Sequence, residues 1–327
     1  MKKLMTMLLS VSLILTMMMG LTMEAHAEET TAVRAGALSG PTAFGLVKLM
    51  EDAANSETAN TYEFAELSTD PSTFVAPLAS GQIDIAAVPA NLASVIYNKT
   101  EGGIKILAIN NLGVLHIVER GETVNSIADL AGKTVYATGA GATPEYTLRH
   151  LLNANGIDPD NDLTIQFCAD TTEALSYINQ DEAAIAMLPQ PFVTAAMAQV
   201  EGLRAAIDLN DAWAELDNGC DIVTGVIVAR SEFVENNPEA VETFLSEYAA
   251  SMAYAEENVE DNAALIEKYG IVAKAPVAMK AFPGVHLSLK TGEEMKASMS
   301  GYLQILFDEN PQAVGGALPG DDFYYGM

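Results

Sequence analysis

The stretch KTVYATGAGATPEYTLRHLL, from Lys133 to Leu152, has the pattern of a β-strand, a glycine-rich turn and a helix. Its first residues favour a strand, and Gly139 and Gly141 allow the backbone to turn sharply. Thr143 is predicted to be the N-cap of the helix and Pro144 its first residue. The N–H groups at such a helix start carry a partial positive charge and point at whatever lies beyond the turn.

This turn lacks the features of two common nucleotide-binding loops. The pattern G-x-G-x-x-G needs a third glycine where this chain has Pro144, and G-x-x-x-x-G-K-[ST] does not occur in the sequence. Taken alone, the turn is explained equally well by packing and by ligand binding.

The same order of elements occurs about one hundred residues earlier. Thr31–Glu51 has the pattern of a strand, a Ser-Gly-Pro-Thr turn and a helix. Strands are then predicted at Thr61–Leu67 and Leu163–Ala169, each before a helix that leads into a short apolar strand. These apolar strands end at Pro89 and Pro189. A common α/β pattern without shared ancestry is an alternative explanation of the repeat.

Two successive β-α-β-α-β-α units predict an α/β protein with two lobes, each a mainly parallel sheet flanked by helices. In such sheets, ligands bind beyond the carboxyl ends of the strands. We therefore expect a ligand cleft between the lobes, where four turns converge. These turns are Ser39–Thr42, Pro89–Asn91, Thr138–Thr143 and Pro189–Pro191.

The chain is expected to pass to the second lobe near Val124–Gly132 and to return along a long strand at Cys220–Phe233. The first lobe is then predicted to contain residues 28–123 and 226–327, and the second lobe residues 124–225. The helical pattern after Phe233 is typical of a packed helical surface.

The chain begins with MKKLMTMLLSVSLILTMMMGLTMEAHA, which has two lysines, an apolar run and an A-x-A ending. This pattern predicts a signal peptide at residues 1–27, cleaved after Ala27, although an uncleaved membrane anchor is an alternative. No cysteine near the end of the apolar run offers a lipid attachment point. We expect a periplasmic or secreted protein.

Charge excludes some partners. Without Lys2, Lys3 and Glu24, the chain has 14 Lys+Arg against 43 Asp+Glu, a net charge of −29. This argues against nucleic acid and anionic membranes as partners, but local N–H groups could still hold a small anion. The only cysteines, Cys168 and Cys220, could form a disulfide or remain two separate thiols.

Several stretches together resemble ABC-transporter solute-binding proteins: SIADLAGKTVYATGAGATPEYTLRHLL, GQIDIAAVPANLAS and SEFVENNPEAVETFL. The most specific parts are D-L-x-G-K-x-V at Asp129–Val135 and G-x-x-D-[IV]-A at Gly81–Ala86. The chain is most similar to the type II periplasmic binding proteins for nitrate, sulfonates, taurine and thiamine-pyrimidine precursors (the SsuA/NMT1-like group). This resemblance implies a two-lobed protein that closes over a small-molecule ligand and delivers it to an ABC permease and ATPase, without catalysis. We expect a monomer.

The ligand-contacting places of that group match the four turns, and Phe44 and Phe192 could flank a planar ligand. The candidate ligand-binding residues are Ser39, Gly40, Pro41, Thr42, Pro89, Ala90, Asn91, Thr138, Gly139, Ala140, Gly141, Thr143, Gln190 and Phe192. These turns contain no arginine or lysine, in contrast to members that read their substrate with a cation. The expected ligand is a sulfonate, a carboxylate or a pyrimidine-like compound with at most one negative charge.

The sequence predicts no enzyme, cofactor or metal site. His116, His150 and His286 show no H-x-x-x-H spacing, and neither G-x-S-x-G nor C-x-x-C occurs. Some thiamine-precursor proteins are enzymes with a cysteine- and histidine-rich iron motif, which this chain lacks. A secreted enzyme on the same scaffold and a sensory ligand receptor are the alternatives. Trp213 is interpreted either as a lid over the cleft or as the anchor of an amphipathic helix.

Overall fold

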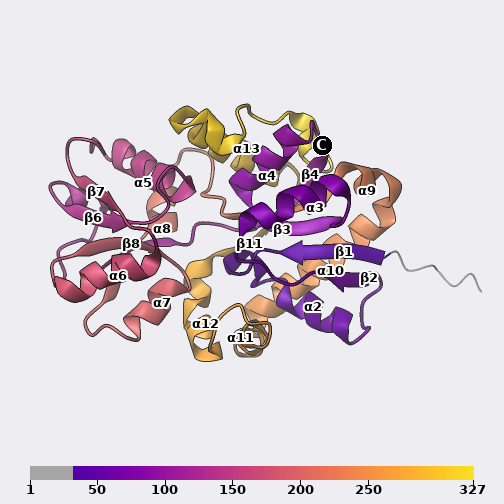
Figure 1. The fold of residues 1–327 in the computed structure, drawn as a ribbon, viewed down its shortest axis with the longest axis horizontal. Coiled ribbons are helices and arrows are strands. Elements are labelled where there is room, and N and C mark those ends of the chain that lie inside the picture. Colours follow the sequence, from indigo (N-terminus) through magenta and orange to yellow (C-terminus); the bar gives the residue numbers. More distant parts are fainter. Residues whose placement is uncertain (1–31) are drawn as a thin grey trace, which may run out of the picture. The chain divides into compact units, whose positions relative to one another are not determined.

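The computed structural model describes residues 32–327, which contain two β-sheets (Figure 1). The first sheet has the strand order β11-β4-β10-β3-β1-β2, and the second has the order β7-β6-β8-β5-β9. The strands of the first sheet are β1 (Ala32–Ala37), β2 (Thr61–Phe64), β3 (Ile85–Pro89), β4 (Ile104–Asn111), β10 (Gly225–Arg230) and β11 (Leu287–Lys290). Those of the second sheet are β5 (Leu115–Glu119), β6 (Thr134–Ala137), β7 (Thr164–Phe167), β8 (Ile185–Pro189) and β9 (Arg204–Asp208).

The two sheets share one arrangement. β1 pairs in parallel with β2 and β3, as β6 does with β7 and β8. An antiparallel strand follows in each sheet: β10 between β3 and β4, and β5 between β8 and β9. The apolar strands β3 and β8 have the same burial pattern. The repeat in the sequence is therefore a repeat of structure, and the predicted α/β class with two helix-flanked sheets is confirmed.

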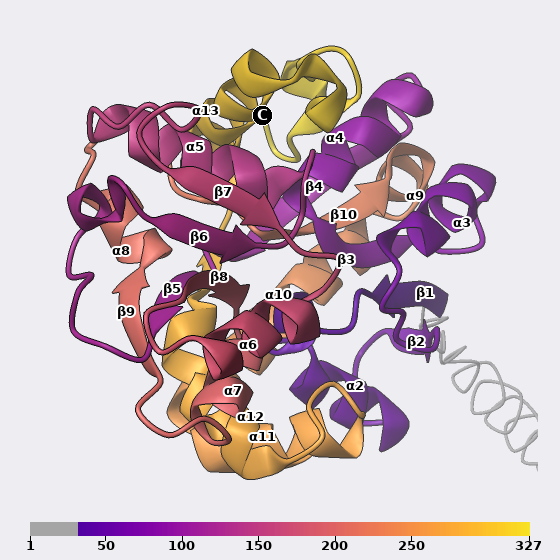
Figure 2. The ribbon, with the colours of Figure 1, turned by 60° about the vertical axis from the view of Figure 1, so that its left-hand side comes forward.

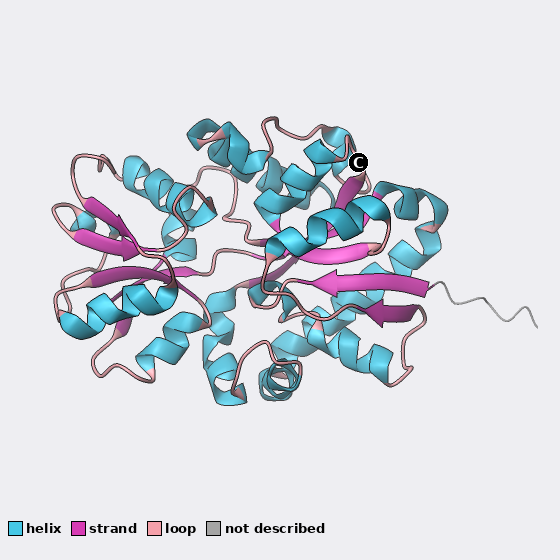
Figure 3. Ribbon diagram, in the orientation of Figure 1, coloured by secondary structure: helices cyan, strands magenta, loops and turns pink. Residues whose placement is uncertain are grey.

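Helices cover both faces of each sheet (Figure 3). On the first sheet, one face carries α2 (Val47–Ala54) and α10 (Pro238–Glu257), and the other carries α3 (Val75–Ser80), α4 (Ala90–Lys99) and α13 (Gly292–Glu309). On the second, one face carries α6 (Thr171–Gln180) and α7 (Phe192–Met197), and the other carries α5 (Thr143–Ala154) and α8 (Leu209–Ala214). The remaining α-helices are α9 (Ser231–Asn236), α11 (Val259–Lys268) and α12 (Ala275–Ala281). Short 3₁₀ segments are η1 (Pro41–Ala43), η2 (Pro71–Phe74), η3 (Ile127–Leu130), η4 (Phe282–Val285), η5 (Pro311–Val314) and η6 (Asp321–Phe323).

The chain passes from the first sheet to the second earlier than expected. β5 precedes the predicted crossing at Val124–Gly132, yet it pairs with β8 and β9. The passage therefore lies between Asn111 and Leu115. The sequence does not reveal where the chain passes between the sheets, because β4 and β5 are both buried and apolar and only three residues separate them. The return ends at Gly225, within the predicted strand Cys220–Phe233. The limits of the two lobes as moving domains stay a prediction.

The G-x-x-D-[IV]-A stretch has a structural role. Asp84, just before β3, has a side chain only 1% exposed and accepts two hydrogen bonds from Arg34 on β1, at 2.6 and 2.7 Å. Arg230, at the end of β10, reaches the same carboxylate at 3.2 Å. Gly81 has φ +74°, and a Cβ there would lie 3.0 Å from the Arg230 guanidinium. The motif therefore holds three strands together.

The D-L-x-G-K-x-V stretch also stabilises the fold locally. Asp129 accepts hydrogen bonds from the N–H groups of Asn125 (2.9 Å) and Ser126 (3.0 Å) and so caps η3. Gly132 has φ +75°, and its N–H donates to the carbonyl of Asp162 at 2.6 Å. This conformation favours glycine.

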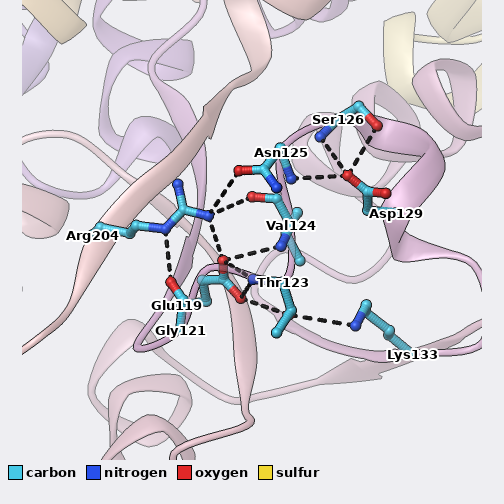
Figure 4. Close-up of polar contacts among 9 residues, drawn as sticks. All are labelled: Glu119, Gly121, Thr123, Val124, Asn125, Ser126, Asp129, Lys133 and Arg204. Atoms are coloured by element: carbon cyan, nitrogen blue, oxygen red, sulfur yellow. Dashed lines mark hydrogen bonds and ion pairs between the residues drawn. The ribbon is translucent and has the colours of Figure 1, made fainter.

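Glu119, at the end of β5, holds the segment that follows it (Figure 4). Its carboxylate accepts hydrogen bonds from the N–H groups of Thr123 (2.9 Å) and Val124 (3.0 Å) and from Arg204 on β9 (2.5 Å). Burial acts to raise the pKa of Glu119, but these bonds and the charge of Arg204 outweigh it and lower the pKa below that of a free glutamate.

The structure shows the surroundings of both cysteines, of Trp213 and of Phe44. Cys168 and Cys220 are both free thiols. Trp213 is buried in α8, and its Nε1 donates to the carbonyl of Cys220 at 2.9 Å, so it anchors the helix and is not a lid. Phe44 is fully buried in the core. The predicted signal peptide, residues 1–27, lies outside the described residues. Between residues 32 and 327, no helix combines the length and apolar character needed to cross a membrane.

Candidate functional site

A cavity of about 430 Å³, termed the first cavity, lies at the carboxyl ends of β3, β6 and β8. Residues of both sheets contribute to its walls, and so do the N-terminal turns of α4 and α5. It is lined by Pro71, Pro89, Asn91, Leu92, Val114, Leu115, Thr138, Ala142, Thr143, Pro144, Thr147, Pro189, Ile222, Val223, Thr224 and Tyr302. The position agrees with the rule for ligand sites in open α/β sheets.

The glycine-rich turn shapes one wall of the first cavity. Gly139 has φ +83° and Gly141 has φ +69°, a left-handed backbone that favours glycine. A Cβ on Gly139 would also lie 2.9 Å from Cγ of Pro144. The turn therefore needs glycine to bring Thr138 and Thr143 to the cavity.

The predicted N-cap at Thr143 was wrong. The N-cap of α5 is Ala142, which makes no side-chain capping bond. Glu145 instead reaches back and accepts a hydrogen bond from the Gly141 N–H at 2.7 Å, while it also binds Arg149 at 2.8 Å. A carboxylate in the first turn satisfies the exposed donors and offsets the positive end of the helix. The sequence reasoning considered only the hydroxyl and overlooked this competing acid.

Among the residues that the structure describes, no charged side chain lines the first cavity. Its polar side chains are Asn91, Thr138, Thr143, Thr147, Thr224 and Tyr302. The hydroxyl groups of Thr147 and Tyr302 lie 3.1 Å apart. Burial raises the pKa of Tyr302, so the phenol stays neutral. The walls can therefore orient a ligand by hydrogen bonds, but they provide no counter-ion.

A second cavity, of about 660 Å³, shares Pro189 with the first. It lies between the α6–α7 side of the second sheet and the α11–α12 segment, which neighbour each other in Figure 2. It is lined by Thr171, Pro189, Gln190, Pro191, Phe192, Ala195, Ala198, Gln199, Ile271, Val272, Ala273, Lys274 and Val277. The amide oxygen of Gln190 accepts a hydrogen bond from the Thr194 hydroxyl at 2.9 Å.

Comparison with known proteins identifies the family. The model of a family described as NMT1/THI5 like matches residues 65–261. The chain belongs to the NMT1/THI5-like family. A Brucella abortus relative described as a binding protein is 24% identical over 239 residues, which cover 72% of this NMT1/THI5-like chain and 70% of the relative.

Two crystal structures show the same fold as this NMT1/THI5-like chain. An ABC transporter protein from Parabacteroides distasonis superposes with a TM-score of 0.74 at 22% identity, over 90% of this chain and 98% of that one. The periplasmic aliphatic sulphonate binding protein SsuA from Escherichia coli has a TM-score of 0.69 at 17% identity, over 90% and 96% of the two chains. The predicted periplasmic binding protein fold is confirmed.

The structure divides the ligand-binding residues predicted for this NMT1/THI5-like protein into three sets. Pro89, Asn91, Thr138 and Thr143 line the first cavity. Gln190 and Phe192 line the second cavity. The residues that line neither are Ser39, Gly40, Pro41, Thr42, Ala90, Gly139, Ala140 and Gly141.

The first predicted turn, Ser39–Thr42, makes hydrogen bonds within the fold. Thr42 is buried, and its hydroxyl donates to the carbonyl of Leu38 at 2.8 Å. The carbonyl of Thr42 accepts from the side-chain amide of Asn110 at 2.8 Å. Ala90 is also buried, at the start of α4. These groups position the strand ends and do not face either cavity.

Sequence reasoning missed part of the first-cavity lining in this NMT1/THI5-like fold. Tyr302 comes from α13, and nothing in the regular helical pattern there distinguishes it. Ile222–Thr224 comes from the return passage between the sheets. The predicted crossing strand was the one signal that placed this segment near the cleft.

Within residues 32–327, one group of side chains outside the linings of both cavities could hold a metal ion. Asp208, Asp211 and His286 each offer a ligand atom, and these atoms lie within 4.8 Å of one another. Asp208 and Asp211 are close in the sequence, but His286 comes from a distant segment, so no local spacing indicated this group.

Proposed function

We propose that this protein is the solute-binding component of an ABC importer and that its ligand binds in the first cavity. The observation that carries the proposal is the position of this cavity, at the carboxyl ends of β3, β6 and β8 with walls from both sheets. The names of the similar proteins support the same role: an ABC transporter protein, a periplasmic sulphonate binding protein and a binding protein.

Capture occurs by closure of one sheet and its helices against the other. The chain passes between the sheets at Leu112–Val114 and again just before Gly225. The N–H of Thr224 donates to the carbonyl of Asn111 at 3.2 Å, so the two passages lie side by side and act as a hinge. The closed protein delivers its ligand to a permease and ATPase. It acts as a monomer outside the cytoplasm, and no chemical step is involved.

The ligand is a small organic molecule with an apolar part and at most one negative charge. Prolines and aliphatic side chains form most of the first cavity, and the lining holds no cation to offset a multiply charged ligand. The N-terminus of α4, at Asn91 and Leu92, can orient an anionic group. The N-terminus of α5 is less available to a ligand, because Glu145 already accepts a hydrogen bond from the Gly141 N–H. A sulfonate, a carboxylate and a neutral pyrimidine all meet these conditions.

A thermal-shift screen of purified protein with alkanesulfonates, carboxylates and pyrimidines tests the proposal. A ligand that binds only the folded state raises the melting temperature. Fluorescence of the single tryptophan, Trp213, gives a second readout, because its ring contacts Tyr302 of the cavity wall at a centroid distance of 5.8 Å.

Variants then locate the site. Asn91→Ala and Thr143→Ala should each weaken binding about two- to tenfold, since one neutral hydrogen bond contributes about 0.5–1.5 kcal/mol. Thr172→Ala, at an exposed threonine of α6, is the matched control and should bind like the parent. If both cavity variants bind as tightly as this control, the first cavity is not the site. A di- or triphosphate as the tightest ligand would contradict the ligand class.

A further inference from the structure

Two histidines meet one aspartate where the second sheet contacts the C-terminal part of the chain. His116 on β5 lies directly opposite Asp208 on β9, and its Nε2 is 3.1 Å from Asp208 Oδ2. His286 precedes β11 of the first sheet, and its Nε2 is 3.0 Å from the same oxygen. The three residues therefore join elements of both sheets at one carboxylate oxygen.

Each histidine faces oxygen acceptors on both sides of its ring. Nδ1 of His116 lies 3.2 Å from the carbonyl of Val114, and Nδ1 of His286 lies 3.4 Å from the carbonyl of Gly113. A neutral imidazole has one N–H. When the N–H of His286 donates to the Gly113 carbonyl, its Nε2 presents a lone pair to Asp208. This lone pair and the carboxylate then point at one another, an arrangement that a cation stabilises.

The carbonyl beside Nδ1 of His286 is a feature expected around a bound metal ion, because a metal-binding histidine commonly donates its other N–H to a backbone carbonyl, which orients the ring. His116 has a different role, since its Nε2 donates to Asp208 and orients the carboxylate.

Packing around the group leaves it accessible on one side. His116 is buried, and a Cβ on Gly284 would lie 2.9 Å from its Nε2, so only glycine allows η4 to pass this closely. Asp211, in the first turn of α8, is exposed, and its carboxylate lies within 4.8 Å of the ligand atoms of Asp208 and His286. An ion could enter from the solvent past Asp211.

We propose that Asp208, Asp211 and His286 bind one divalent transition-metal ion, and that His116 orients Asp208 from the other side. The ligand atoms of the three proposed ligands lie within 4.8 Å of one another. One imidazole with two carboxylates suits zinc and similar ions. With bonds of about 2.0–2.1 Å, tetrahedral ligand atoms lie about 3.3–3.4 Å apart, and Nε2 of His286 is 3.0 Å from Oδ2 of Asp208. This site is independent of the ligand in the first cavity. The ion would join the second sheet to the segment before β11.

The test uses tag-free protein that has been stripped with EDTA and dialysed. Titration with Zn²⁺ should show one ion bound per chain and a rise in melting temperature, and Co²⁺ should give the visible absorption of a protein-bound ion. Asp208→Asn and His286→Asn should each weaken Zn²⁺ binding at least tenfold. Both changes are conservative: Asn can still cap α8 at position 208, and Asn tolerates the left-handed backbone of His286, φ +50°.

Matched controls separate this site from binding to the acidic surface. His150→Gln removes a histidine that contacts the Trp213 ring and lies outside the group, and it should bind Zn²⁺ like the parent. Asp211→Asn, at an exposed side chain that leaves the fold unchanged, should weaken binding by a smaller factor. No bound ion in the parent overturns the proposal. So does Zn²⁺ affinity that is equal in the parent, Asp208→Asn, His286→Asn and Asp211→Asn.

Discussion

The hydroxyl groups of Thr147 on α5 and Tyr302 on α13 lie 3.1 Å apart on the wall of the first cavity. α5 packs on the second sheet, whereas α13 follows the last strand of the first sheet. Both side chains are buried, so the bond is shielded from water. It connects the two halves of the fold at the cavity.

This bond should have a measurable effect on stability. Tyr302→Phe keeps the ring and removes the hydroxyl, and we expect the free energy of unfolding to fall by about 1 kcal/mol. Thr147→Val should have a similar effect. The double variant should lose less than the sum of the two, because the shared bond is lost only once. Urea unfolding measures all three, and strict additivity would contradict the bond.

Ligand binding in the first cavity should depend little on salt, because no charged side chain lines it. Between about 0.01 M and about 0.15 M salt, the Debye length falls from about 30 Å to about 8 Å. The dissociation constant should change less than about threefold over this range. Isothermal titration at both salt concentrations measures it, and a steep loss of affinity would indicate charge steering.

Asn91→Asp tests the charge of the ligand. The change keeps the side-chain shape and adds one negative charge to the wall of the first cavity. An anionic ligand should bind much more weakly to Asn91→Asp than to Asn91→Ala, and the gap should be widest at low salt. A neutral ligand should bind both variants alike.

Asp84 should be essential for stability. Asp84→Asn leaves the guanidinium groups of Arg34 and Arg230 without their shared charge partner. Breaking a buried pair costs about 3–5 kcal/mol, but Arg34 is 42% exposed, so we expect a loss of about 2–3 kcal/mol after screening by water. Glu232→Gln is the control, since that partner of Arg230 is 73% exposed. Its effect should stay below about 1 kcal/mol. Equal losses in urea unfolding would refute this role.

The turn before α5 should tolerate alanine poorly. Gly139→Ala and Gly156→Ala both place a Cβ on a left-handed backbone, at φ +83° and +74°, which costs about 1–2 kcal/mol each. Only the Cβ at position 139 also meets Pro144, at 2.9 Å, whereas position 156 is open. We expect Gly139→Ala to be the less stable variant by about 1 kcal/mol. Thermal unfolding of the two should differ accordingly.

Glu119 should make stability depend on pH. Its pKa is lowered in the folded protein, so its carboxylate stabilises the fold above the unfolded-state pKa of about 4.3. That contribution is lost as the pH falls through the lower folded-state pKa. Glu119→Gln should be about 2 kcal/mol less stable than the parent at neutral pH, and this difference should shrink below about pH 4.

The control for this pH effect is Glu182→Gln, whose partner bond to Arg120 is exposed to solvent. Urea unfolding from pH 7 to pH 3 compares the three proteins. A difference between the parent and Glu119→Gln that stays constant down to pH 3 would show that the carboxylate does not carry the effect.

Local pattern was sufficient to predict much of the fold. Apolar strands that end at Pro89 and Pro189, and turns that open helices, are set by neighbouring residues, and the structure has them where expected. The turns were placed at the carboxyl ends of strands by a general rule, and the first cavity lies there. The N-cap of α5 could not be predicted from Thr143 alone, because Glu145 competes for the same donors.

Long-range pairing could not be predicted. β10 and β11 join the first sheet from beyond the second repeat, and β5 joins the second sheet from before its repeat. No local feature shows which strands they pair with. The same limit applies to Tyr302, which reaches the first cavity from α13, and to His286, which meets Asp208 only after folding.

The central position of β10 has a consequence for how the chain is made. β10 lies between β3 and β4 but is synthesised after every strand of the second sheet. The second sheet is complete once β9 has left the ribosome, whereas the half that was begun first is finished last. Until β10 emerges, β3 and β4 present unpaired backbone edges, which pair readily with other chains. From the emergence of β4 to that of β10, a nascent chain therefore carries two unpaired strand edges that can pair with another chain.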